Sequence, residues 1–88
     1  MDIEYDPAKD AINQAKHGLP LAFGAFVLRD VIADVPDPRD YSGEMRRVSF
    51  GLVSGRLFVC VYTLRGETRR IISARKANSR EQRQWLRP

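Results

Sequence analysis

The residues best suited to chemistry in this chain are cations near its C-terminal end. Residues 69–77 read Arg-Arg-Ile-Ile-Ser-Ala-Arg-Lys-Ala, an apolar pair with cations on both sides. Arginine presents planar, paired donors that match phosphate oxygens, and it can stack on bases. Because Arg70 and Arg75 flank an apolar segment, we expect them to hold a phosphate. Arg47 and Lys76 are further candidates, with a solvated charge at a strand edge as the alternative for each.

His17 is the only histidine and the only side chain whose ordinary pKa lies near neutrality. This property makes it the first candidate for a general acid or base. It also falls in the last turn of a predicted helix, where histidine often contacts the free carbonyls or the negative end of the dipole. A catalytic and a capping role therefore both remain open.

The charges of the chain are divided between its two halves. Residues 1–44 contain nine acidic and four basic side chains, whereas residues 45–88 contain eleven basic and two acidic ones. Twelve of the fifteen cations are arginine, a bias that GC-rich coding could produce but that does not explain their clustering. Positive charge gathered on one part of a small domain favours a polyanionic partner, DNA or RNA.

Length and composition narrow the class of protein. Eighty-eight residues fit one domain spanning 1–88, and 43% hydrophobic with 30% charged residues is typical of a globular chain. Met1 is followed by Asp2 and Glu4 rather than by an apolar segment, which argues against a signal peptide. One cysteine, Cys60, and one histidine argue against a structural metal site and suit a reducing compartment. We expect a cytoplasmic protein without a cofactor.

The elements that must position these residues begin with a short strand at residues 3–5. Asp6 can cap a helix that has proline in its first turn, and Gly18 is suited to end it. A second helix is predicted over residues 20–28. Gly24 costs that helix about 1 kcal/mol relative to alanine, or it lets the two helices approach closely.

The second half of the chain predicts mainly strands. We expect strands at 31–35, 45–53, 56–64 and 67–75, a polar loop at 36–43, and a final helix at 80–86. Ser54-Gly55 and Arg65-Gly66 predict tight hairpins, so the last three strands form an antiparallel meander. Asn78 or Ser79 would cap the last helix. The order β-α-α-β-β-β-β-α predicts an α+β fold with helices packed on an antiparallel sheet.

Alternation assigns side chains to the faces of these strands. In the strand at 45–53 the two sets are Val48, Phe50 and Leu52 on one face and Arg47, Ser49 and Gly51 on the other. We expect the apolar set to pack on the helices and the other set to carry a cation on the sheet surface. The strand at 56–64 is apolar on both faces, which predicts a central position. Whether Arg69 or Arg70 lies beside Arg47 remains open.

Three groups of residues resemble the toxins of the BrnT family. They are residues 3–9 with Asn13 and Lys16-His17-Gly18; Glu44, Arg46, Arg47, Gly51 and Leu52; and residues 70–77 with Glu81 and Trp85. The resemblance runs along the whole chain without a large insertion. It departs from the family at Tyr5, where tryptophan is frequent, and at residues 20–24, which replace a more acidic helix start.

The resemblance implies a RelE-like fold and a toxin of a type II toxin–antitoxin pair. Such a toxin would be a metal-independent endoribonuclease that cleaves RNA and inhibits translation. A BrnA-type, DNA-binding antitoxin would neutralise it, so that the toxin would meet DNA only through the complex. No membrane partner is implied. The alternative is a non-catalytic basic module that binds nucleic acid or protein.

Cleavage of this kind uses the ribose 2′-OH as nucleophile and needs a base, an acid and cations for the charge on phosphorus. The catalytic candidates are His17, Arg47, Arg70, Arg75 and Glu81. The candidates for RNA binding are Lys16, Arg46, Tyr62, Arg69 and Lys76. Glu81 is either a base or a group that orients Arg75. Tyr62 either stacks on a base or is an ordinary cross-strand aromatic, and for Arg69 a solvated surface charge is preferred.

Overall fold

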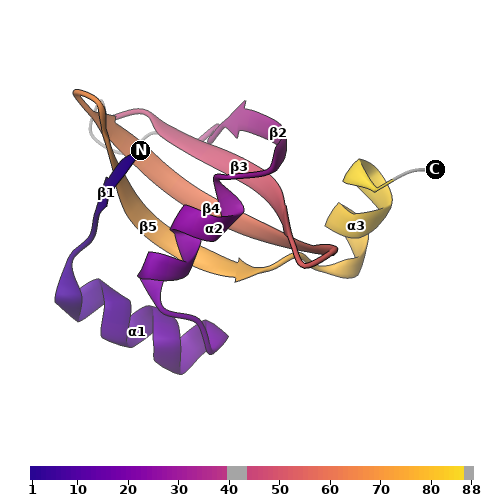
Figure 1. Cartoon of the computed structure of the whole chain (residues 1–88), viewed down its shortest axis with the longest axis horizontal. Helices are drawn as coiled ribbons and strands as arrows, with labels where there is room; N and C mark the ends of the chain where they lie inside the picture. The colour runs from indigo at the N-terminus through magenta and orange to yellow at the C-terminus, as the bar shows by residue number, and fades with distance from the viewer. Residues whose placement is uncertain (40–43, 87–88) are drawn as a thin grey trace.

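The computed structural model describes residues 1–39 and 44–86 (Figure 1). Its elements are β1 (Asp2–Glu4), α1 (Pro7–His17), a 3₁₀ turn η1 (Leu21–Phe23), α2 (Gly24–Val27), β2 (Val31–Pro36), β3 (Arg46–Val53), β4 (Arg56–Arg65), β5 (Thr68–Lys76) and α3 (Ser79–Trp85). This architecture confirms the predicted α+β class. The first strand lies one residue earlier than expected, and part of the predicted loop at 36–43 lies outside the described residues.

The sheet has five strands in the order β1-β5-β4-β3-β2. β1 is parallel to β5, and every other neighbouring pair is antiparallel. The antiparallel meander of β3, β4 and β5 is therefore confirmed, as is the central position of β4. No helix in the described ranges is long and apolar enough to span a membrane.

Helix α1 is fixed to the edge of β5 by Asn13, a residue that sequence reasoning did not single out for a structural role. The Asn13 amide donates to the carbonyl of Ala74 at 2.9 Å and to that of Leu19 at 2.7 Å, and its oxygen accepts from the Ala74 N–H at 3.3 Å. Asn13 is only 5% exposed, and its side chain pairs with Ala74 as a neighbouring strand would. His17 follows four residues later on the same face of the helix, so this contact also positions His17 against β5.

The second predicted helix is shorter than expected, because a 3₁₀ turn replaces its first part. Its close neighbour is the sheet, which corrects the expectation that Gly24 lets two helices approach. A Cβ at Gly24 would lie 2.9 Å from Cys60 Sγ, and one at Gly51 would lie 2.0 Å from the Val27 carbonyl oxygen. These two glycines allow α2 to rest directly on β3 and β4, as Figure 1 shows from the front.

The two faces of the sheet are covered by different helices. The helical face carries Phe58, Cys60, Tyr62 and Ile71, which pack with Leu21 and Val27 of the N-terminal helical segment. The opposite face, called the open face below, carries Phe50, Leu57 and Val59, with Ala77 and Trp85 packed against them.

This arrangement corrects one prediction. The face with Val48, Phe50 and Leu52 packs on α3, where the Phe50 and Trp85 ring centroids are 5.2 Å apart. The N-terminal helices cover the other face, which includes Gly51 and the fully buried Ser49. Beyond α3 the open face is left with Val48 and Val61 only partly buried.

Candidate functional site

The predicted site residues meet in part on the open face of the sheet. A groove there, called the basic groove below, is lined by Lys16, His17, Arg39, Arg46, Val48, Val61, Ile72, Ser73 and Arg75. Its floor is a cross-strand row, because Val48 pairs with Val61 and Val61 pairs with Ser73. The end of α1 forms one wall, and arginines from β3 and β5 stand around the floor. The groove therefore combines one imidazole with four cations.

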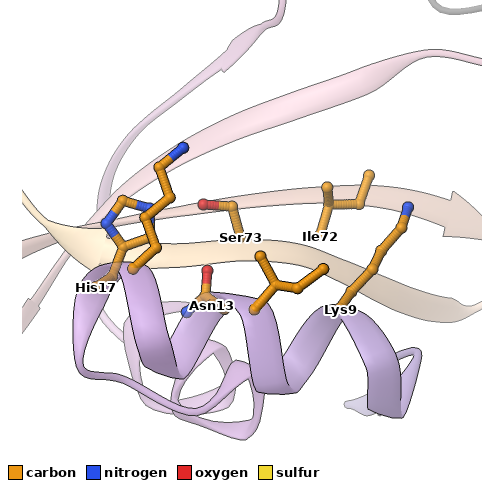
Figure 2. Close-up of a pocket in the computed structure, with 7 residues that line it drawn as sticks. Lys9, Asn13, His17, Ile72 and Ser73 are labelled. Carbon is orange, nitrogen blue, oxygen red and sulfur yellow. The ribbon is translucent and has the colours of Figure 1, made fainter.

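His17 lies at the wall of this groove and is partly buried. Figure 2 shows its ring and the Ser73 hydroxyl pointing toward one another across the gap between α1 and β5. Burial, together with the charges of Lys16 and Arg75, holds the pKa of His17 below its ordinary value of 6.5. At neutral pH the ring is therefore largely uncharged and able to accept a proton. The ring is therefore able to act as a general base, and this role stays a prediction.

Arg75 is held in a fixed orientation by Glu81. Its two terminal nitrogens donate to the two carboxylate oxygens of Glu81, each at 2.8 Å. Glu81 also accepts from the Asn78 N–H at 2.9 Å and so completes the capping box of α3. The hydrogen bond from Arg75 is the main reason that the pKa of Glu81 is lowered. The geometry matches the orienting role for Glu81, because its carboxylate is already occupied as an acceptor.

Arg46 and Arg70 flank Thr63 on the open face, since Thr63 pairs with both across the sheet. Arg46 lines the basic groove. Arg70 instead forms an ion pair with Glu4 of β1, with Nη1 3.2 Å from Oε2. Arg70 thus shares the face of the groove but lies at its margin.

Three other predicted residues lie on the helical face, away from the groove. Arg47 pairs with Tyr62 across β3 and β4, and the Arg69 guanidinium lies 5.5 Å from the Tyr62 ring centre. Arg47 and Tyr62 share the partner Asp34, which accepts from Arg47, from the Ser49 hydroxyl at 2.8 Å and from the Tyr62 hydroxyl at 2.6 Å. We call these five residues the Asp34 cluster.

Asp34 was missed by sequence reasoning, although an acidic residue within a strand rich in valine and isoleucine was a usable signal. Burial opposes ionisation of Asp34, but hydrogen bonds from Tyr62, Ser49 and Arg47 outweigh it and hold the pKa below its ordinary value. The Asp34 cluster therefore ties the edge strand β2 to β3 and β4. It favours the structural alternatives for Arg47 and Tyr62, whose roles with RNA stay predictions.

The remaining candidates also lie on different faces of the sheet. Lys16 lines the basic groove, whereas Lys76 pairs with Phe58 and lies on the helical-face side at the end of β5. Arg39 and Ser73 also line the groove and were not predicted individually. Among residues 1–39 and 44–86, no three His, Cys, Asp or Glu side chains come together as a metal site would require.

Comparison with known proteins identifies the family of this chain. The family model described as the ribonuclease toxin BrnT of type II toxin–antitoxin systems matches residues 5–81. This range contains every residue that lines the basic groove. A search of curated proteins finds no match.

Proposed function

Because the chain belongs to the BrnT family of ribonuclease toxins of type II toxin–antitoxin systems, we propose that the basic groove is its RNA-cleaving site. The toxin acts there as a metal-independent endoribonuclease with a RelE-like fold, and it inhibits translation in the cytoplasm. The observation that carries this proposal is the meeting of His17 with Arg46 and Arg75 around one floor.

The proposed reaction begins when His17 accepts the proton of a ribose 2′-OH. The resulting oxygen attacks the adjacent phosphorus, the bond from phosphorus to the 5′-oxygen breaks, and a 2′,3′-cyclic phosphate forms. Arg75 and Arg46 stabilise the extra negative charge on phosphorus in the transition state. The leaving 5′-oxygen takes a proton from water. Glu81 acts through Arg75 by holding the guanidinium in place.

The donors that the groove offers support metal independence. Its lining residues within the described part of the chain include no carboxylate, and Mg²⁺ depends on carboxylate and phosphate oxygens. Arginines supply the positive charge that a metal ion would otherwise bring to the phosphate.

We predict that the purified toxin cleaves single-stranded RNA in the presence of EDTA. Arg75→Ala protein prepared in the same way controls for contaminating nuclease, since it should be far less active. Product analysis should detect 2′,3′-cyclic phosphate ends. Activity that disappears with the chelator and returns with Mg²⁺ would overturn metal independence. Tight RNA binding without any cleavage would instead favour the non-catalytic module.

Membership of the family implies an antitoxin protein as partner and RNA as target. We propose that the antitoxin is of the BrnA type, binds DNA, and covers the open face together with α3. Its acidic or amphipathic segment would then mask Arg46, Arg70 and Arg75. Arg47, a catalytic candidate in the sequence, lies on the helical face and falls outside this surface.

Hydrogen exchange on the toxin–antitoxin complex tests this docking mode. Masking should bury roughly 600–1,000 Å² of the toxin and protect amides in β3, β5 and α3 relative to the free toxin. Protection confined to residues 7–28 would show that the antitoxin docks on the N-terminal helices and acts at a distance.

A further inference from the structure

A second hollow continues the basic groove along α1. It is lined by Lys9, Ile12, Asn13, Lys16, His17, Ile72 and Ser73. Four of these residues, Lys16, His17, Ile72 and Ser73, line the basic groove as well. The two hollows therefore form one path, with His17 and Ser73 at their junction. We call this second hollow the α1 extension, and Figure 2 shows the residues that line it.

The α1 extension carries cations that no neighbouring acid neutralises. Lys9 and Lys16 are both exposed and lie two helical turns apart, a rise of about 10.5 Å along the axis. Neither ammonium group forms an ion pair with another described residue. The nearby acid of the helix, Asp10, is occupied elsewhere, because it accepts from the Leu21 N–H at 2.7 Å and from Gln14 at 2.9 Å.

An apolar surface lies between the two lysines. Ile12 is 64% exposed, although it stands on the helix that packs against the sheet. Ile72 contributes from β5, where the pairing shifts by one residue between Val61 and Tyr62. A path with an apolar wall and cations at both ends has the two features that a nucleotide requires, a contact for the flat base and a charge for the phosphate.

We propose that the α1 extension is a second nucleotide subsite of the RNA substrate. Lys9 and Lys16 bind phosphates of the strand on one side of the cleaved bond, and Ile12 with Ile72 contacts a base. The subsite rests on the proposed cleavage of RNA in the basic groove. It accepts single-stranded RNA, because a single strand exposes its base faces to such a wall.

Binding of non-cleavable RNA isolates the subsite from catalysis. Fluorescence anisotropy would compare a 2′-O-methyl dinucleotide, too short to reach Lys9, with an octanucleotide that can fill both hollows. Lys9→Ala should weaken octanucleotide binding by roughly threefold to tenfold and lower its salt slope by about 0.7. It should leave dinucleotide binding unchanged. Ile12→Ala should weaken octanucleotide binding without changing the salt slope.

Arg29→Ala is the matched control. It removes one positive charge from the end of α2, where the guanidinium lies 5.4 Å from the Phe26 ring centre. If Lys9→Ala binds the octanucleotide as tightly as Arg29→Ala does, the proposed subsite is wrong. Unchanged RNA binding combined with weaker antitoxin binding would also overturn it, and would assign the surface to the protein partner.

The outcomes also distinguish failure of the proposed subsite from failure of the proposed function. Cleavage by the wild-type protein with no effect of Lys9→Ala overturns the subsite alone. Octanucleotide binding that depends on Lys9, without cleavage by the wild type, overturns the catalytic proposal and supports the subsite. A wild-type protein that binds neither oligonucleotide overturns both.

Discussion

Replacing His17 with alanine is expected to lower the rate of RNA cleavage by roughly 10²–10⁴-fold, the usual contribution of a general base. His17 lies in the basic groove with Arg46 and Arg75, and its lowered pKa keeps the ring ready to accept a proton at neutral pH. Single-turnover cleavage of a short RNA measures the effect. Thermal unfolding of the variant serves as the control, because the fold should lose little stability when this partly buried side chain is shortened.

The pH profile distinguishes the base from a helix cap. Proton transfer requires the uncharged ring, so the wild-type rate should fall as pH drops through the His17 pKa, which lies below 6.5. The rate should be level above that value, and the acidic limb should be absent from His17→Ala. If His17→Ala keeps the wild-type rate, His17 is a helix cap and not the base. The same conclusion holds if the rate falls only in proportion to the fraction of protein that is folded.

Replacing Arg75 with alanine is expected to lower cleavage by roughly 10²–10³-fold, as removal of one charge-stabilising donor does in other enzymes. Toxicity in cells that express the chain alone should be relieved accordingly. Arg75 lies in the groove and is oriented by both oxygens of Glu81, so alanine removes a fixed cation from the phosphate.

Arg47→Ala provides a control of matched chemistry. Arg47 is also a strand arginine paired with a carboxylate, Asp34, but it lies on the helical face. Its loss should cost about 1 kcal/mol of folding free energy, since Asp34 keeps two other donors. The specific activity of the folded protein should be unchanged. Full toxicity of Arg75→Ala at matched expression, or equal loss of activity in both variants, would show that the groove is not the site.

Much of the local structure could be predicted from the residues alone. Asp6 and Gly18 bound α1 as expected, and Asn78 caps α3 together with Glu81. The apolar character of both faces of residues 56–64 identified the central strand. These features depend on short stretches of chain, where capping groups, turn residues and side-chain periodicity act within a few positions. The family motifs are local in the same sense.

The contacts that build the site join residues far apart in the chain. Asn13 fixes α1 to Ala74, 61 residues away, and Asp34 receives the Tyr62 hydroxyl from 28 residues away. No periodicity indicates such partners, because they depend on how the elements pack. The length of α2 was also mispredicted, because it too depends on packing between distant residues. Val27 at the end of α2 lies against Gly51 of β3.

The face on which each cation lies depended on packing as well. Alternation places Arg46 and Arg47 on opposite faces, but it does not say which face the N-terminal helices cover. Arg70 and Arg75 are an odd number of positions apart, so a regular strand would separate them. The register shift in β5 brings both onto the open face, where Arg70 pairs with Thr63 and Arg75 with Val59. An irregularity of one residue in strand pairing thus placed the two arginines on one surface, and only the assembled sheet reveals it.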